Sequence, residues 1–140
     1  MDSPRTTTAQ QPTPTAEPAA RIPRSKALGN YGERLAARHL VAQGLVVLER
    51  NWRSRTGEID LVLREDDVLV VCEVKTRTST ALGTPHEAVN ETKVSRLQRL
   101  GQEWLGQHPW VRPAGVRVDL VAVLRPRRGP SVVEHVRGIG

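Results

Sequence analysis

The chain has 140 residues, enough for one domain with a substantial hydrophobic core. Its 21 lysines and arginines exceed its 15 aspartates and glutamates, so its net charge of +6 suits a polyanionic partner without requiring one. A single cysteine excludes an internal disulfide framework. The lack of a long apolar run and of signal-peptide features indicates no membrane segment, so we expect a cytoplasmic protein.

Residues 1–26 are rich in Thr, Pro, Ala and Gln and contain almost no large apolar side chains. Such a composition cannot offset the conformational entropy that a chain loses when it folds. We therefore expect a disordered N-terminal tail over residues 1–26, followed by a single domain over residues 27–140.

The first predicted element is a helix from Leu28 to Gln43, which Gly44 should end. Apolar residues recur at helical spacing along one side, at Leu28, Tyr31, Leu35, Ala36 and Leu40. Glu33 lies at the edge of this stripe. It is equally consistent with a solvated residue and with a carboxylate that reaches a functional site.

Residues 45–52 alternate too little for a strand with one exposed face, so we expect a mostly buried strand that pairs with the next one. The connection that follows carries Arg53 and Arg55, which should lie at the same end of the sheet as Lys75 and Arg77. We expect these side chains to form one basic rim, although arginines in loops are commonly just solvated.

Two apolar, β-branched runs, residues 57–63 and 68–77, flank the acidic break at residues 64–67, a pattern typical of a β-hairpin. A turn centred between Asp66 and Asp67 places Asp60 opposite Glu73. The same register places Glu58 opposite Lys75, and side-chain alternation puts all four on one face of the sheet. The other face, formed by Ile59, Leu61, Leu63, Val70, Cys72 and Val74, is apolar.

Directly opposed residues of a hairpin have Cβ atoms about 5 Å apart, so the carboxylates of Asp60 and Glu73 should repel each other unless a cation or a proton intervenes. Mg²⁺ is one such cation, because it prefers hard oxygen ligands and keeps several of its waters. The alternative is a salt-bridge ladder on a solvated face, formed by Glu58, Asp60, Glu73 and Lys75. The residues by themselves leave both interpretations open.

The second predicted helix begins at Thr84, where Thr84, Pro85 and Glu87 form a capping box, and continues to about Leu105. Its inward stripe consists of Leu97, Leu100 and Trp104. Lys93 lies on this stripe one turn earlier. Its ammonium group either reaches the acidic face of the hairpin or extends to solvent.

Two further strands are predicted, at residues 116–124 and 131–136, joined by an arginine-rich turn. Asp119 is an isolated acid within the first of them. We expect it to form a salt bridge at the end of the sheet, with support of the acidic site as the alternative. The predicted order of elements is α-β-β-β-α-β-β.

The run Gly57-Glu58-Ile59-Asp60, followed by the Val-x-Glu-Val-Lys-x-Arg run that ends at Arg77, resembles the YraN-like family of small bacterial proteins. That family is placed in the PD-(D/E)XK, or restriction-endonuclease-like, nuclease superfamily and is similar to archaeal Holliday junction resolvases. The resemblance covers roughly residues 29–123 and implies an α/β fold with a mixed β-sheet flanked by helices. One departure is Ile59, which stands where the superfamily name has proline.

The resemblance also implies roles for individual residues. Asp60 and Glu73, together with the backbone carbonyl of Val74, would bind Mg²⁺ or Mn²⁺, and Lys75 would be the catalytic lysine. The resemblance also makes Glu33 an auxiliary candidate, because an acid on this helix sometimes completes the metal site in the superfamily. The predicted positions, independently of the resemblance, make Glu58 and Lys93 auxiliary candidates, with Glu58 holding the Lys75 ammonium. The predicted basic rim makes Arg53, Arg55 and Arg77 candidates for contacts to nucleic acid.

The expected function is a metal-dependent endonuclease that hydrolyses phosphodiester bonds, in branched or processed DNA during repair or recombination. DNA is favoured over RNA as the partner, no membrane is expected, and a homodimer is suggested by analogy with junction-cutting relatives. One alternative is a non-catalytic nucleic-acid-binding module with the same fold. Another is an interaction protein without a nucleic-acid role. The two acids and the lysine favour cleavage, because phosphate binding alone would select against opposed carboxylates.

Overall fold

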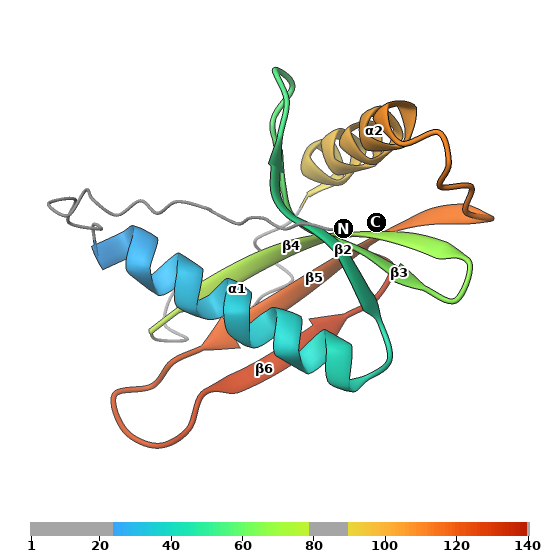
Figure 1. The fold of residues 1–140 in the computed structure, drawn as a ribbon. Helices are drawn as coiled ribbons and strands as arrows, with labels where there is room; N and C mark the ends of the chain where they lie inside the picture. Colours follow the sequence, from blue (N-terminus) through green and yellow to red (C-terminus); the bar gives the residue numbers. More distant parts are fainter. Residues whose placement is uncertain (1–23, 79–89, 140) are drawn as a thin grey trace, which may run out of the picture.

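The computed structural model describes residues 24–78 and 90–139. These residues form helices and strands in the predicted order (Figure 1). The elements are α1 (Arg24–Ala42), β2 (Val46–Arg53), β3 (Glu58–Glu65), β4 (Val68–Arg77), α2 (Glu91–Gln107), β5 (Gly115–Leu124) and β6 (Val132–Val136). The strands form one sheet in the order β2-β3-β4-β5-β6. Because β4 and β5 are parallel and the other neighbours are antiparallel, the predicted mixed α/β sheet is confirmed.

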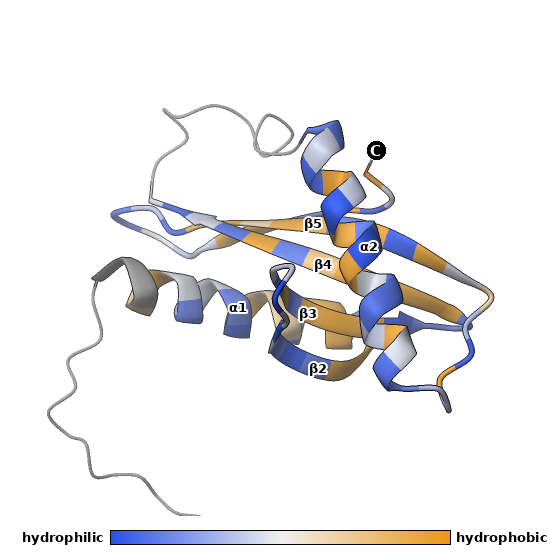
Figure 2. Cartoon of the chain, turned by 90° about the horizontal axis from the view of Figure 1, so that it is seen from above, coloured by the Kyte–Doolittle hydropathy of each residue, from blue (hydrophilic) through white to orange (hydrophobic). Residues whose placement is uncertain are grey.

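The two helices pack on opposite faces of the sheet and create two apolar clusters. Beneath α1 the cluster contains Ala36, Leu40, Leu61, Leu63, Val70 and Cys72, among others. Beneath α2 it contains Leu97, Leu100, Trp104, Val62, Leu69 and Val71, among others. In Figure 2 the apolar residues concentrate on the central strands β4 and β5, which are covered on both sides. This arrangement confirms both predicted helix stripes and explains why β4 reads as a continuous apolar run.

The prediction of a mostly buried strand at residues 45–52 is wrong. Within β2 only Trp52 is buried, while Val46 and Leu48 are 43% and 36% exposed. β2 is an edge strand of the sheet, and only β3 pairs with it among the described elements. The apolar residues of β2 therefore did not indicate burial, because an edge strand leaves some of them exposed.

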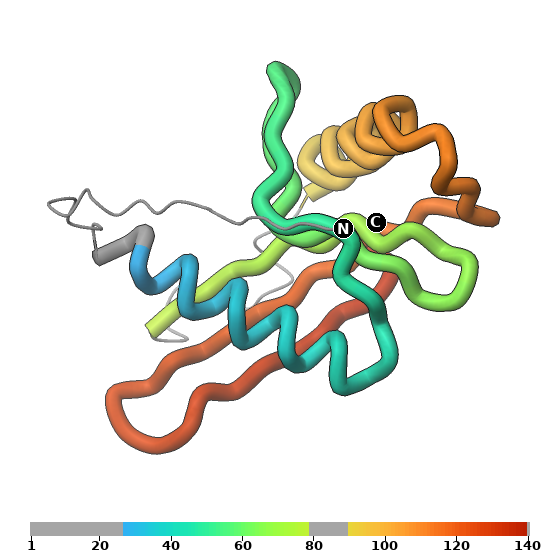
Figure 3. The backbone as a smooth tube through the Cα atoms, viewed as in Figure 1, coloured from blue at the N-terminus to red at the C-terminus, as the bar shows by residue number. Residues whose placement is uncertain are grey.

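The predicted hairpin register is confirmed, because Leu61 pairs with Cys72 and Glu65 pairs with Val68. This pairing ends at Leu61, however, whereas the N-terminal part of β3 continues to pair with β2 as far as Glu58 and Arg53. The β2–β3 connection rises from the sheet beside α2 (Figure 3). As a result Ile59 packs in the cluster beneath α2, and its prediction on the opposite face is wrong.

Helix α1 approaches the end of β4 closely at one glycine. A Cβ atom at Gly32 would lie 1.8 Å from Thr76 Oγ1 and 2.9 Å from Thr76 Cβ. No other residue type fits this position without displacing the helix or the strand. The close approach brings the N-terminal half of α1 near the site described below.

Two predictions fall largely outside the described residues. The tail at residues 1–26 does so except for Arg24–Lys26, which belong to α1. The capping box at Thr84 lies wholly outside. As described, α2 begins at Glu91 with Asn90 as its N-cap, whose Oδ1 accepts a hydrogen bond from Lys93 N–H at 2.9 Å. Neither described helix is long and apolar enough to cross a membrane.

Candidate functional site

Asp60 lies on β3 at the point where the pairing with β4 ends. Its Oδ2 atom accepts a hydrogen bond from the backbone N–H of Val74 at 2.8 Å. A side-chain oxygen thus replaces the backbone acceptor that a longer hairpin ladder would supply. This bond holds the Asp60 carboxylate beside Glu73 and Val74 of β4, as the register predicted.

Glu73 lies between two lysines. Its Oε2 atom is 3.4 Å from Lys75 Nζ on the same strand and 2.7 Å from Lys93 Nζ, which comes from the first turn of α2. The Glu73 side chain is only 13% exposed. Lys93 therefore reaches the acidic face, and the alternative in which it extends to solvent is excluded. Although burial favours the neutral amine, the hydrogen bond to Glu73 raises the pKa of Lys93 overall.

The Asp60 carboxylate is held where its negative charge is unfavourable. Burial raises its pKa to about 7, and the neighbouring carboxylates of Glu73, Glu33 and Glu58 contribute to the rise. The hydrogen bond from Val74 opposes the rise but does not cancel it. None of the described lysines, arginines or histidines forms an ion pair with Asp60, so the fold supplies too little positive charge to compensate it.

Glu33 is half-buried on α1 and faces these carboxylates. Burial raises the pKa of Glu33, and the charges of Glu58 and Glu73 raise it further. A hydrogen bond with Asn51 acts in the opposite direction. Glu33 is therefore not a fully solvated helix residue. We call Asp60 and the three acids that raise its pKa the acidic cluster. It consists of Glu33, Glu58, Asp60 and Glu73.

The predicted contact between Glu58 and Lys75 is wrong. Glu58 instead forms an ion pair with Arg53 of β2 at 2.9 Å, and both side chains are largely exposed. The reason is that β3 has already left β4 at this point and pairs with β2. Among the described acids, only Glu73 forms an ion pair with Lys75 and positions it.

The predicted placement of Arg53 and Arg77 at the same end of the sheet is confirmed, because β2 and β4 both end there, but the arginines do not form one rim. Arg55 belongs to the β2–β3 connection, which lies beside α2 because Ser54 Oγ donates a hydrogen bond to Glu103 Oε1 at 2.7 Å. The end of β4, which carries Arg77, lies apart from this connection (Figure 1). The arginines thus occupy separate places, and their contacts to nucleic acid stay a prediction.

The donor atoms of the site suit magnesium or manganese. No three of the described His, Cys, Asp and Glu side chains converge to hold a metal ion on their own. Mg²⁺ needs no such group, because it commonly takes one or two carboxylates and completes its shell with water and phosphate oxygens. Asp60 and Glu73 provide two hard oxygen ligands, and the uncompensated charge of Asp60 favours a cation. The residues present therefore fit a hydrated divalent ion.

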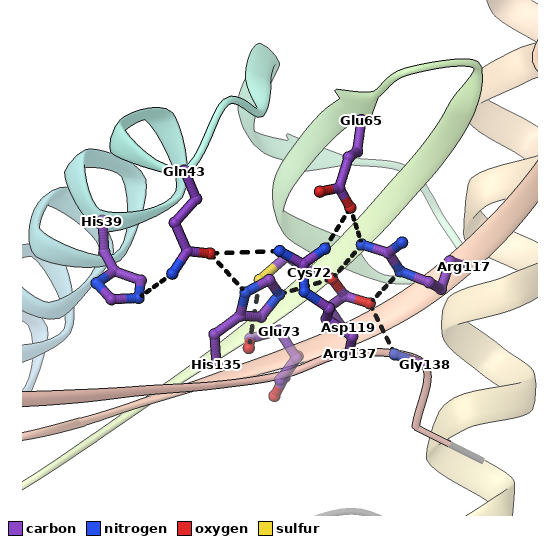
Figure 4. Close-up of polar contacts among 10 residues, drawn as sticks. All are labelled: His39, Gln43, Glu65, Cys72, Glu73, Arg117, Asp119, His135, Arg137 and Gly138. Atoms are coloured by element: carbon purple, nitrogen blue, oxygen red, sulfur yellow. Dashed lines mark hydrogen bonds and ion pairs between the residues drawn. The ribbon is translucent and has the colours of Figure 1, made fainter.

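The sequence reasoning missed a second polar cluster, centred in the middle of β5 where Asp119 pairs with Cys72 of β4 (Figure 4). Its centre is Asp119, which is fully buried. Asp119 accepts hydrogen bonds from Arg117 Nε at 2.8 Å, from His135 Nε2 at 2.7 Å and from Gly138 N–H at 2.9 Å. The predicted salt bridge of Asp119 is confirmed. The further hydrogen bonds of its network were not predicted.

Both carboxylate oxygens of Asp119 have hydrogen-bond partners. Although burial acts to raise it, the pKa of Asp119 is lowered by Arg117, Gly138 and His135. The guanidinium groups of Arg137 and Arg117 lower the pKa of Glu65 to about 2. In contrast to Asp60, Asp119 is fully compensated, so we assign it to stability. The signal in the sequence was an arginine and an aspartate two residues apart within an apolar strand.

Comparison with known proteins places most of the chain in one family. A family model described as "Uncharacterised protein family UPF0102" matches residues 32–123, a range that includes the whole acidic cluster, Lys75 and Lys93. A UPF0102 protein of Nocardioides sp. is 64% identical over 126 residues, which cover 90% of this chain and 99% of the relative. UPF0102 proteins of Kineococcus radiotolerans and Streptomyces coelicolor are each 58% identical over 81% of this chain, and they are covered to 93% and 88%.

Proposed function

The chain belongs to the uncharacterised protein family UPF0102, and we propose that it is a metal-dependent endonuclease that hydrolyses phosphodiester bonds. The observation that carries this proposal is the acidic cluster around Asp60. Asp60 is half-buried, and its charged form, with the pKa raised to about 7, destabilises the site unless a cation joins it. The resemblance of the two hairpin motifs to PD-(D/E)XK nucleases supports the same chemistry.

Asp60 and Glu73, with the backbone carbonyl of Val74, would hold the Mg²⁺ or Mn²⁺ ion. When bound, such an ion polarises a phosphate and lowers the pKa of a water molecule. The Val74 N–H fixes the orientation of the Asp60 carboxylate. This fixed orientation leaves less rearrangement for the moment of reaction.

The two lysines supply positive charge to the same place. Lys75 and Lys93 both approach Glu73, and Lys75 is the more exposed, at 36% against 26%. We therefore assign to Lys75 the contact with the scissile phosphate. Its ammonium would stabilise the negative charge that develops on the phosphate or orient the attacking water. Lys93 keeps Glu73 in position from α2. The proposed partner is nucleic acid, with DNA ahead of RNA.

The proposal is tested by incubating the full chain with branched, flapped, single-stranded and linear DNA, and with RNA, in Mg²⁺, in Mn²⁺ and in EDTA. We expect cleavage that requires metal and that is lost in Asp60→Asn and Glu73→Gln. Glu134→Gln is the matched control, because it neutralises an exposed acid on β6. It should retain the activity.

Two outcomes would remove the proposal. Equal cleavage by Asp60→Asn and the unchanged chain would assign the activity to a contaminant. Salt-sensitive binding that survives in Asp60→Asn, without cleavage of any substrate, would support the non-catalytic binding module instead.

A further inference from the structure

Trp110 presents its indole ring to solvent. The side chain is 73% exposed, the largest exposure among the exposed large apolar residues that the structure describes. The residue lies in a turn closed by the hydrogen bond from Val111 N–H to His108 O at 2.9 Å. The next segment is fixed by Ala114 N–H, which donates to Asp67 O at 2.7 Å. A single exposed apolar residue is normal on a protein surface, so the surroundings of Trp110 decide whether it marks a binding site.

The ring is also supported from below. It meets the His108 ring edge to face, with the two centroids 5.2 Å apart. His108 in turn stacks on the buried Trp104 at 3.8 Å, and its Nδ1 donates a hydrogen bond to the Trp104 carbonyl oxygen at 2.7 Å. Little conformational freedom remains to be lost when a ligand stacks on Trp110.

Beside Trp110 lies a hollow of about 270 Å³ that is lined by apolar and charged side chains. Leu48, Leu69, Val111 and Pro113 supply the apolar lining. The charged lining residues are Arg64, Arg112 and Asp67, so cations outnumber acids there. Arg64 and Arg112 are both exposed. We call this place the Trp110 hollow.

A planar aromatic face next to two guanidinium groups matches a nucleotide, because the base can stack on the indole while the arginines bind the phosphate. A second copy of the chain fits less well. A two-fold contact through this patch would bring the arginines of both copies together.

We infer that the Trp110 hollow binds an unpaired nucleotide of the nucleic acid whose cleavage is proposed above, so this inference rests on that proposed function. The hollow lies past the C-terminal end of α2, whereas Lys93 and the acidic cluster lie at its N-terminal end. A helix of 17 residues is about 25 Å long. The hollow would therefore hold a single-stranded part of the substrate well away from the scissile phosphate and favour branched, flapped or overhanging substrates.

The test measures binding in EDTA by fluorescence anisotropy, with a short oligothymidylate and a blunt duplex as labelled probes. Trp110→Ala is expected to weaken binding of the single strand about tenfold, because stacking on an aromatic ring contributes that much per base. Trp110→Phe should keep most of the affinity. The blunt duplex should bind both variants as it binds the unchanged chain. Val132→Ala, which truncates another exposed apolar residue on β6, is the matched control and should change nothing.

Three results would overturn the inference, and they separate it from the proposed function. Unchanged single-strand binding by Trp110→Ala, together with metal-dependent cleavage by the unchanged chain, removes this inference alone. A dimeric chain that becomes monomeric in Trp110→Ala assigns the hollow to a second copy. Failure of the unchanged chain to bind or cut any nucleic acid removes both proposals.

Discussion

At pH 8 in the presence of EDTA, Asp60→Asn is expected to raise the free energy of unfolding by about 2 to 4 kcal/mol. The pKa of Asp60 rises from 3.8 to about 7 in the folded chain, because partial burial desolvates the carboxylate and three other acids lie near it. Each pKa unit corresponds to about 1.4 kcal/mol, and the upper figure assumes that no relaxation occurs. An asparagine removes the buried charge and keeps an oxygen for the Val74 N–H.

The pH dependence follows from the direction of this shift. Because the folded chain binds the Asp60 proton more tightly than the unfolded chain, this group makes stability fall as the pH rises from about 4 to about 7. The advantage of Asp60→Asn should therefore be complete at pH 8 and shrink by more than half at pH 5. Urea unfolding at the two pH values measures both quantities.

Glu134→Gln is the control, since this exposed acid should change stability by less than about 0.5 kcal/mol. An Asp60→Asn variant that is less stable than the unchanged chain at both pH values would show that the carboxylate supports the fold. In that case the Asp60 charge would not destabilise the fold and would give no reason to infer a bound cation.

For Asp119→Ala we expect the opposite sign, a loss of about 3 to 5 kcal/mol in the free energy of unfolding. The substitution leaves Arg117 and the nearly buried His135 without the carboxylate that they share. It also releases the Gly138 N–H, and with it the C-terminal residues that lie on β5. Because the pKa of Asp119 is lowered in the fold, its contribution is present above the ordinary aspartate pKa and is lost as the pH falls below it.

Urea unfolding at neutral pH measures this loss. Asp67→Asn serves as the matched control, because it changes an exposed aspartate in the β3–β4 turn. A loss below about 1 kcal/mol for Asp119→Ala would mean that the network around it is not formed in solution.

The contrast between the two aspartates separates a functional site from a structural one. Both lie in strands of the same sheet; Asp119 is fully buried, and Asp60 is half-buried. Asp119 forms an ion pair with Arg117 and accepts a hydrogen bond from His135, whereas no described cation pairs with Asp60. A protein gains stability by removing a group such as Asp60, so its presence is best explained by the chemistry that it performs.

The hairpin and its facing acids could be predicted from the sequence, because residue alternation and an acidic turn fix the register of two adjacent strands. The order of elements and the inward faces of both helices followed from periodicity in the same way. What could not be predicted is where β3 separates from β4. This depends on Trp52 and Ile59 packing beneath α2, a contact between segments far apart in the chain. The separation redirects Glu58 to Arg53.

Long-range contacts also explain the other differences. The helix stripe left open whether Lys93 reaches the acidic face, and the packing of the first turn of α2 beside Glu73 of β4 decides it. Glu33 joins the acidic cluster because α1 approaches Thr76 at Gly32. The Asp119 network needs β3, β5, β6 and the C-terminal residues to meet. Each of these contacts is set by tertiary packing, not by local propensity.

Calorimetric titration of Mn²⁺ into the full chain at pH 8 tests the central claim most directly, namely that Asp60 and Glu73 form a divalent-cation site. We predict saturable Mn²⁺ binding by the unchanged chain and by Glu134→Gln, with proton release when the titration is repeated at pH 6, below the raised Asp60 pKa of about 7. Asp60→Asn and Glu73→Gln should show neither. Binding of Mn²⁺ that is equal in Asp60→Asn and the unchanged chain, or absent from both, would contradict the account.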